Sequence, residues 1–403
     1  MVAIIVQKYG GTSLQTTERI RQAANRIIGE RENGNQLVVV VSAMGDSTNH
    51  LEQLSREVSS CTNGREKDLL LSTGEQVSCA LMALALQEKG QAAIAMTGEQ
   101  AGIEVEYLHG NAKVTAIHTK SMKKELQKGK VVIVAGFQGV AANGELCTLG
   151  RGGSDTTAAA LAAALKADRC DICTDVDGVY AADPRVIPNA GKYSYMDYDS
   201  LLTMAEMGAG VIHPRAVAHA KEYQVPLVIR SSFSEHEGTW ISKDTSISSV
   251  AGVTYQTNLC HLRLFGRRLK KEKLLRWMKD SGVIGTKDVH SHLEELLVVI
   301  KKDDLDQTIS MLNPYKDQLG IQTIQTENQK AAIHLIFVNE EKKRKQTALL
   351  NEKKFMPLED VHSIDTHQAV WSVAVPEEHG RDLARRVYAA FMSGTQHKFP
   401  LAH

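Results

Sequence analysis

A glycine-rich stretch near the middle of the chain has the residue types of an anion-binding turn. Residues 148–157 read TLGRGGSDTT, with an arginine directly before two adjacent glycines. Because glycine has no Cβ, this backbone can approach a charged ligand closely. The alanine- and leucine-rich residues 158–165 predict a helix, for which Ser154 and Asp155 are suitable N-caps. The N–H groups at such a helix start favour an anion, although a tight loop without a ligand fits the same residues.

A second group of residues suited to chemistry lies near the N-terminus. Lys8 is followed by Tyr9 and by the adjacent glycines Gly10 and Gly11. A lysine, backbone N–H groups and carboxylates that hold Mg²⁺ are the parts that phosphoryl transfer requires, because that reaction depends on positioning and charge stabilisation. The P-loop motif G-x-x-x-x-G-K-[ST] and the dinucleotide motif G-x-G-x-x-G are both absent from the sequence, so neither of those sites is favoured.

Short apolar runs that end in glycine or small-residue turns predict the strands that position these residues. We expect strands at 3–9, 37–41, 92–96, 131–135, 170–175 and 226–229, and helices near 20–28, 49–59, 65–89, 158–165, 197–208 and 213–223. This alternation predicts an α/β fold, with an open, mostly parallel sheet sandwiched by helices. Ligands of such sheets bind beyond the carboxyl ends of the strands, where the glycine turns lie. Four polar residues should therefore converge on one cleft: Lys8, Thr48, Glu75 and Arg151.

The composition changes after residue 232. Residues 233–249 are polar and predict a linker. Beyond them, strands expected at 262–265, 296–300, 333–337 and 369–375 alternate with amphipathic segments near 270–280, 304–313, 341–351 and 378–392. This rhythm predicts two small ferredoxin-like units, at 250–325 and 326–393. Residues 394–403 are expected to form a disordered tail, and residues 1–232 to form the catalytic domain.

The composition excludes several classes of function. Lys plus Arg equals Asp plus Glu, at 47 each, and aromatic residues make up 5% of the chain, so a nucleic-acid partner is not expected. No apolar run suggests a membrane span, and residues 1–9 are typical of a first strand and not of a signal peptide. The six cysteines are scattered, which suits a reducing cytoplasm. Cys170 and Cys173 would lie on opposite faces of a strand, so no zinc site is expected there.

Several motifs together resemble the aspartokinases of the amino acid kinase family. They are KYGGTS at 8–13, VSAMG at 41–45, GFQG at 136–139, LGRGGSDT at 149–156, TDVDGVY at 174–180 and DPR at 183–185. The resemblance covers residues 1–232 densely. It implies transfer of the ATP γ-phosphate to the β-carboxylate of L-aspartate, the first step towards lysine, threonine and methionine. ATP and Mg²⁺ are the implied cofactors, and the cytoplasm is the implied location.

The same resemblance implies a role for individual residues. Lys8 would stabilise the transferring phosphoryl group, and Asp155 would organise the catalytic centre. The expected aspartate-binding residues are Thr48, Glu75, Arg151, Gly152, Gly153 and Ser154. The expected nucleotide-binding residues are Lys8, Tyr9, Gly10, Gly11, Ser42, Thr174, Asp175, Tyr180, Asp183 and Arg185. No side chain is expected to act as a dedicated metal ligand.

Some features depart from the family pattern and leave alternatives open. Gly210 stands where many members carry a lysine near the nucleotide, and residues 266–275 lack the glycine-rich turn that usually holds an effector amino acid. The C-terminal region resembles regulatory ACT domains loosely, which implies a homodimer and feedback by lysine or threonine. The alternatives are a different carboxylate acceptor, or a catalytically weakened homologue that senses an amino acid. Glu75 could also be an ordinary exposed helix residue, and Tyr180 a packing residue.

Overall fold

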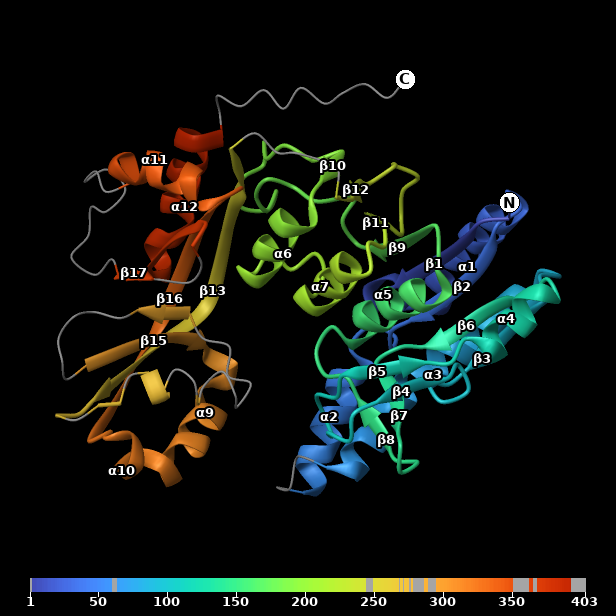
Figure 1. The fold of residues 1–403 in the computed structure, drawn as a ribbon, viewed down its shortest axis with the longest axis horizontal. Helices are drawn as coiled ribbons and strands as arrows, with labels where there is room; N and C mark the ends of the chain where they lie inside the picture. The colour runs from blue at the N-terminus through green and yellow to red at the C-terminus, as the bar shows by residue number, and fades with distance from the viewer. Residues whose placement is uncertain are drawn as a thin grey trace. The chain divides into compact units, whose positions relative to one another are not determined.

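The computed structural model describes residues 2–59, 64–243, 249–267, 269–270, 272–274, 277, 286–288, 295–350, 362–364 and 368–392. The chain forms two compact units (Figure 1). The N-terminal unit consists of Met1–Val179, Lys192–Glu206 and Gly210–Ser246. The C-terminal unit consists of Tyr180–Gly191, Met207–Ala209 and Ile247–His403.

An eight-stranded sheet forms the centre of the N-terminal unit, in the order β10-β12-β11-β9-β1-β2-β6-β3. Its strands are β1 (Ile4–Tyr9), β2 (Gln36–Val41), β3 (Ala93–Met96), β6 (Val131–Ala135), β9 (Arg169–Thr174), β10 (Tyr195–Met196), β11 (Leu227–Ser231) and β12 (Thr239–Ile241). The strands from β11 to β3 are parallel to one another, whereas β12 is antiparallel to β11. The predicted α/β class and the mostly parallel sheet are confirmed.

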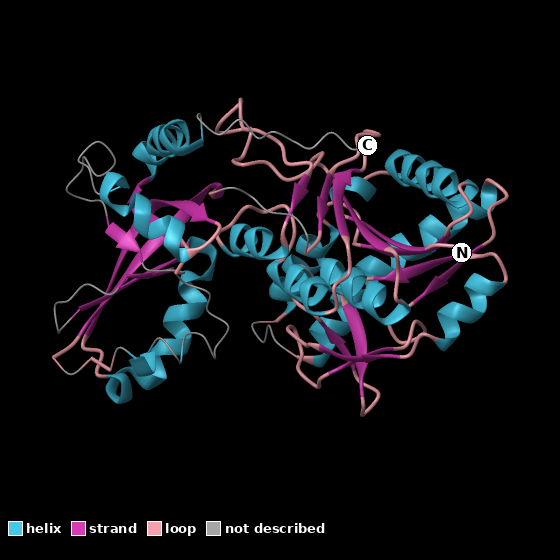
Figure 2. Ribbon diagram, turned by 45° about the horizontal axis from the view of Figure 1, so that its top comes forward, coloured by secondary structure: helices cyan, strands magenta, loops and turns pink. Residues whose placement is uncertain are grey.

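Helices cover both faces of this sheet (Figure 2). On one face α1 (Thr17–Glu32) packs against α3 (Arg65–Glu88), and α2 (Ser47–Val58) packs against α3. On the other face α5 (Gly153–Leu165) packs on β1, β2 and β9. Further helices are α4 (Lys120–Gln127), α6 (Tyr198–Glu206) and α7 (Pro214–Glu222), of which α7 packs against α5. Strands covered on both faces are accordingly almost continuous in valine and isoleucine, as β2 and β6 show.

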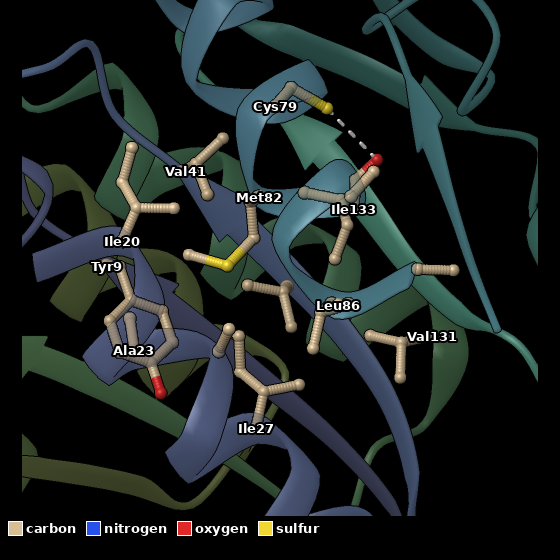
Figure 3. Packing of buried hydrophobic residues seen from close by; sticks show 14 of the residues in the cluster. Tyr9, Ile20, Ala23, Ile27, Val41, Cys79, Met82, Leu86, Val131 and Ile133 are labelled. Carbon is tan, nitrogen blue, oxygen red and sulfur yellow. Dashed lines mark hydrogen bonds between the residues drawn. The ribbon is translucent and has the colours of Figure 1, made fainter. Parts of the chain in front are cut away.

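The main core lies between this sheet and the helix pair α1 and α3 (Figure 3). Ile27 of α1, Met82 and Leu86 of α3 and Ile133 of β6 are each 0% exposed. Burying each of these side chains contributes about 1.5–3 kcal/mol. The thiol of Cys79 donates a hydrogen bond to the carbonyl oxygen of Ile133 at 3.3 Å, so the cysteine is satisfied inside the core.

Helix α3 is long and apolar enough to cross a membrane by length and composition, with a mean hydropathy of 1.5 in its most apolar window. This corrects the expectation that no such run exists. Half of that window is buried inside the structure, and α3 packs on β2, β3 and β6. Its buried face also carries the acidic residues Asp68 and Glu75. These contacts are those of a core helix.

Several short strands were not predicted. A four-stranded sheet of order β5-β4-β7-β8 consists of β4 (Ile103–Val105), β5 (Val114–Ile117), β7 (Gln138–Ala141) and β8 (Leu146–Thr148). Strand β12 lies inside residues 233–249, so the expectation of a plain linker is wrong for that part. Thr239 and Ile241 are 0% exposed, and β12 pairs with both β10 and β11. Runs of three or four residues are too short to show a periodicity in the sequence.

The C-terminal unit contains a six-stranded antiparallel sheet in the order β14-β15-β13-β16-β18-β17. Its strands are β13 (Val250–Phe265), β14 (Thr286–Asp288), β15 (Glu295–Lys301), β16 (Thr323–Phe337), β17 (His362–Ile364) and β18 (Val370–Pro376), and its helices include α9 (Leu305–Leu312), α10 (Lys316–Leu319), α11 (Glu340–Leu350) and α12 (Glu377–Met392). The ferredoxin-like ACT class agrees with this sheet. The predicted boundary at 325/326 falls inside β16, so how the region divides into units stays a prediction. The tail 394–403 and most of the segment 270–280 lie outside the described residues.

A histidine is buried in the middle of the C-terminal sheet. His334 of β16 is 0% exposed, and its Nδ1 atom lies 2.7 Å from the hydroxyl of Ser372, its partner across the strand pair. The Nε2 atom has no hydrogen-bond partner among the described residues. Burial lowers the pKa of His334 to about 4. The folded unit therefore holds this imidazole neutral.

We predict that His334 makes the protein sensitive to acid. Between about pH 6.5 and about pH 4 the unfolded chain binds a proton that the folded chain does not, so the free energy of unfolding falls as the pH drops through this range. His334→Gln should remove most of this loss, which urea titrations at several pH values would measure. His118→Gln, at a largely exposed histidine, is the control and should keep the wild-type slope. Equal slopes for all three proteins would contradict the prediction.

Candidate active site

A lysine and an aspartate that lie far apart in the sequence meet beside the central sheet. The Nζ atom of Lys8, on β1, lies 2.7 Å from Oδ1 of Asp155, on α5, and each side chain is 12% exposed. The other carboxylate oxygen of Asp155 accepts a hydrogen bond from the backbone N–H of His213 at 3.2 Å. The two residues predicted as catalytic are therefore brought together, with most of their surface removed from water.

Tyr9 is the neighbour of Lys8 on β1 but faces the opposite way. Its side chain is 0% exposed and packs with Ile20 and Ala23 of α1 (Figure 3). Successive side chains of a strand point to opposite faces, so a lysine that faces α5 requires a tyrosine that faces α1. The prediction that Tyr9 binds the nucleotide is wrong for its side chain. Burial raises the pKa of Tyr9 well above its ordinary value.

The glycine turn after β1 fits closely against the turn after β2. A Cβ on Gly11 would lie 2.9 Å from the carbonyl oxygen of Ala43, closer than real Cβ contacts. The N–H of Gly45 donates to the carbonyl oxygen of Gly11 at 3.0 Å, and a Cβ on Gly10 would lie 3.3 Å from the Nζ atom of Lys8. These glycines therefore form a compact backbone cradle directly beside the lysine.

Glu75 approaches the same turn from α3. The N–H of Ala43 donates to Oε1 of Glu75 at 3.1 Å, and Glu75 is 3% exposed. Its Oε2 atom is buried and has no hydrogen-bond partner among the described residues. Desolvation raises the pKa of Glu75 to about 7. The alternative of an exposed helix residue is thereby excluded, and a buried carboxyl oxygen is left without a protein donor.

The predicted helix caps are corrected by the structure. Helix α5 begins at Gly153, and its N-cap is Gly152, which has the left-handed φ of 69°. Ser154 and Asp155 thus lie inside the first turn, where the side chain of Asp155 pairs with Lys8 and does not cap the helix. A Cβ on Gly152 would lie 2.1 Å from the ring of His213, so only glycine fits there. The early start leaves the first N–H groups of α5 next to Asp155.

Two residues missed by the sequence analysis hold the turn before α5. His213 and Arg215 belong to the sequence IHPR at the start of α7. The Nη2 atom of Arg215 donates to the carbonyl oxygens of Leu149 and, at 3.5 Å, of Arg151. The ring nitrogen Nδ1 of His213 accepts the N–H of Arg215. Proline is common at the first position of a helix, so the sequence signals that α7 starts here. It does not signal the roles of His213 and Arg215, because their contacts to the turn before α5 form only in the folded chain.

The end of β9 adjoins the glycine cradle. The N–H of Gly10 donates to the carbonyl oxygen of Cys173 at 3.2 Å. The N–H and hydroxyl of Ser232 both donate to the carbonyl oxygen of Thr174, and the hydroxyl of Ser232 lies 2.7 Å from that of Ser13. Thr174 donates in turn to Asp175, which is exposed. Thr174 and Asp175 therefore lie at the same sheet edge as Lys8.

The remaining predicted residues are placed as follows. Ser42 follows β2 and donates its N–H to the carbonyl oxygen of Tyr9, while Thr48 lies half-buried in the first turn of α2. Arg151 is exposed. Three of the expected nucleotide-binding residues belong to the C-terminal unit, namely Tyr180, Asp183 and Arg185. Their part in a nucleotide site stays a prediction. Within that unit Arg185 pairs with Asp183 at 2.8 Å.

The two cysteines of the C-x-x-C motif are structural. Cys170 and Cys173 are both buried in β9, and neither is in a disulfide. Burial raises the pKa of the Cys173 thiol to about 12. Such thiols are poor metal ligands and poor nucleophiles at neutral pH.

We predict that the space around Ser154 does not tolerate a methyl group. A Cβ on Gly136, after β6, would lie 2.7 Å from the hydroxyl oxygen of Ser154 and 3.0 Å from Cγ1 of Val40. Gly136→Ala should lower the free energy of unfolding by about 1–3 kcal/mol because of overpacking, as measured by urea titration. Gly29→Ala is the control, since a Cβ there meets nothing within 4 Å in a helix, and should stabilise by up to about 1 kcal/mol. A Gly136→Ala protein as stable as the wild type would contradict this reading of the site.

Known proteins share this sequence and fold. Residues 3–231 match the model of the Amino acid kinase family. Aspartokinase 2 of Bacillus subtilis is 44% identical over 351 residues, which cover 83% of this chain and 84% of that protein. The aspartokinase of Thermus thermophilus is 36% identical over 402 residues, which cover 97% of this chain and 99% of that protein. The solved structure of E. coli aspartokinase III shares the fold, with a TM-score of 0.80 at 22% identity and coverage of 96% and 99%. The chain belongs to the amino acid kinase family and, within it, to the aspartokinases.

Proposed function

We propose that the protein transfers the γ-phosphoryl group of ATP to the β-carboxylate of L-aspartate. The observation that carries the proposal is the Lys8–Asp155 pair beside the cradle of Gly10 and Gly11. Ala43, which packs on this cradle, donates to Oε1 of Glu75, whose Oε2 atom has no hydrogen-bond partner among the described residues. One end of this constellation suits phosphate oxygens, and the other suits an ammonium group. An amino acid whose side chain accepts a phosphoryl group requires both features in one site, one for the phosphate and one for its own ammonium group.

The phosphoryl side is built from one charge and a tight backbone. Lys8 provides a positive charge where negative charge spreads over the oxygens of the transferring group. Asp155 holds the ammonium of Lys8 in place before the substrates bind, so less reorganisation is needed during transfer. A Cβ on Gly10 would lie 3.3 Å from the Nζ atom of Lys8, so its absence leaves room for phosphate beside the lysine, while Gly11 lets the turn pack closely against Ala43. In such transfers, positioning and charge stabilisation account for most of the catalysis.

The acceptor side has complementary charges. Oε2 of Glu75 is buried and unpaired, so an ammonium group there would gain a charge-assisted hydrogen bond. Arg151 is exposed in the turn before α5, and its planar guanidinium matches a carboxylate in a bidentate way. The N–H of Gly153 is bonded to the carbonyl oxygen of Gly150 at 2.9 Å, so it is the N–H groups after it in the first turn of α5 that would favour a second carboxylate. L-Aspartate has one ammonium and two carboxylates, which matches this set.

Mg²⁺ fits the donor chemistry of this edge. It prefers oxygen ligands and is usually held by one or two carboxylates together with phosphate oxygens and water. Among the described residues, the exposed Asp175 lies at this edge, and Asp155 lies there with its oxygens facing Lys8 and the N–H of His213. The phosphates would therefore supply most of the ligands. When bound, the ion neutralises charge on the phosphate oxygens.

The relatives support the substrates and suggest a regulator. One structure of E. coli aspartokinase III contains aspartate and ADP, and another contains lysine and aspartate. We propose the same substrates for this chain, with lysine or threonine as a feedback effector and a homodimer formed through the C-terminal unit. A place in the cytoplasm, in the biosynthesis of lysine, threonine and methionine, follows from the same proposal.

A coupled assay of ADP release tests the proposed function. Turnover should require aspartate, ATP and Mg²⁺, and should be negligible with glutamate. Lys8→Ala should lower kcat by about 10²-fold or more, because it removes the charge that faces the transferring group. Lys8→Arg keeps the charge and should lose less, whereas Lys120→Ala, at an exposed lysine of α4, should match the wild type. Turnover with another acceptor and none with aspartate would refute the proposal.

We predict that aspartate binding releases a proton through Glu75. Near pH 6 the raised pKa of Glu75 keeps the empty site largely protonated, and an ammonium ligand would favour the ionised form. Calorimetric titrations in two buffers of different ionisation enthalpy should then show release of up to about one proton per aspartate. Glu75→Gln should weaken binding and abolish the release.

Glu88→Gln is the matched control for this titration. Glu88 lies exposed at the end of the same helix, so its replacement should leave the proton release unchanged. Identical binding enthalpies in the two buffers for the wild-type protein would contradict the role given to Glu75.

A further inference from the structure

A second buried carboxylate on α3 has no part in the function proposed above. Asp68 lies seven residues before Glu75, on the same side of the helix, and is 1% exposed. No lysine or arginine is paired with it among the described ion pairs, where its partner is His109. A buried carboxylate without a strong cationic partner is costly unless hydrogen bonds satisfy its oxygens. The donors that do so come from strand β8 and from the loop 109–111.

The first group of donors lies on β8, which leads into the turn before α5. The N–H of Thr148 donates to Oδ2 of Asp68 at 2.9 Å, and the hydroxyl of Thr148 donates to Oδ1 at 2.7 Å. Thr148 directly precedes residues 149–153, which we call the acceptor loop because they include Arg151 and the start of α5. Asp68 therefore fixes both the backbone and the side chain of the residue that enters the acceptor loop.

The second group of donors lies in the loop 109–111. The N–H of Gly110 donates to both oxygens of Asp68, at 3.1 and 3.0 Å, and Nδ1 of His109 lies 3.0 Å from Oδ2. This loop packs directly against the acceptor loop, since a Cβ on Gly150 would lie 2.8 Å from the carbonyl oxygen of Gly110 and 3.1 Å from the side chain of Asn111. Asp68 thus holds the acceptor loop directly and through its neighbour.

Asp68, His109 and Cys147 also lie close enough to one another to hold a metal ion. The carboxylate, however, already accepts hydrogen bonds from Gly110 and from Thr148 on both of its oxygens. Two of these donors are backbone N–H groups, which cannot turn away to make room for a cation. The hydrogen bonds account for the cluster as an anchor of the backbone.

We propose that Asp68 is a positioning residue for the acceptor substrate. Its hydrogen bonds to Thr148 and Gly110 hold the acceptor loop from the side of α3, while Arg215 holds the carbonyl oxygens of Leu149 and Arg151 from the side of α7. The glycine cradle of residues 10 and 11 is held by different contacts, to Cys173 and Gly45. Loss of Asp68 should therefore impair the use of aspartate and spare the use of ATP. This inference rests on the proposed function.

The kinetic test uses Asp68→Asn in the full-length protein. The asparagine side chain has the same shape, but its NH₂ group cannot accept a hydrogen bond from the N–H groups that face it. The acceptor loop should therefore loosen. The KM for aspartate should rise about tenfold or more while the KM for ATP stays within about twofold. Thr148→Val should show a smaller rise of the same kind, and Thr148→Ser, which keeps the hydroxyl, should restore a value near the wild type.

A second measurement does not depend on the reaction. Arg151 is exposed, so trypsin can cleave after it once the acceptor loop leaves its fixed conformation. Asp68→Asn should speed this cleavage severalfold at a temperature where the protein stays folded. Glu125→Gln is the matched control, because Glu125 is a carboxylate of the same unit that is 8% exposed and pairs with Lys128 and Lys130. It should change neither the cleavage after Arg151 nor the KM for aspartate.

The outcomes separate this inference from the proposed function. If the wild-type protein shows no aspartate-dependent turnover, the proposed function fails, and cleavage after Arg151 still reports on Asp68. If the wild type turns over and Asp68→Asn changes both KM values equally, or neither, the positioning role is wrong. Cleavage after Arg151 at the wild-type rate in Asp68→Asn would overturn it as well.

Discussion

The candidate site depends on one pair of opposite charges, Lys8 and Asp155, which lie 2.7 Å apart and are 12% exposed each. Removing one partner of such a largely buried pair costs about 3–5 kcal/mol, because the other charge is then left without compensation. The pair joins the end of β1 to the first turn of α5. Gly11 and Gly152 lie in the turns next to these two elements, and neither has room for a Cβ, because Ala43 packs on the first and His213 on the second.

Helix α3 carries two buried carboxylates, Glu75 and Asp68, to which we have assigned proposed roles on the acceptor side and whose hydrogen bonding differs. Glu75 has one oxygen without a partner, and its pKa is raised to about 7, so it has capacity left for a cation. Both oxygens of Asp68 already accept hydrogen bonds from the protein, so neither is left for a ligand. Their spacing of seven residues puts both on the buried side of the helix. Burial alone therefore does not identify a ligand-binding carboxylate; the unsatisfied oxygen does.

The sequence predicted the α/β class and the main strands, because glycine turns after apolar runs are local signals. That Lys8 and Asp155 share one centre was implied only by the family resemblance. Side chains alternate between the two faces of β1, so Tyr9 lies on the face opposite to Lys8 and is buried there. Helix α5 begins at Gly153, earlier than the sequence predicts, because the left-handed conformation of Gly152 that starts it cannot be recognised from the residue type alone. The roles of Asp68 and Arg215 could not be predicted, because their partners lie about 80 and 65 residues away and are found only by folding.

A double-mutant cycle on the free energy of unfolding tests the central pair most directly. It compares the wild type with Lys8→Met, with Asp155→Asn and with the protein that carries both changes, each unfolded in urea. The pair predicts a coupling of about 1 kcal/mol or more, so that the double variant is more stable than the sum of the single losses implies. Strictly additive losses would show that the two charges do not stabilise each other and would contradict the account.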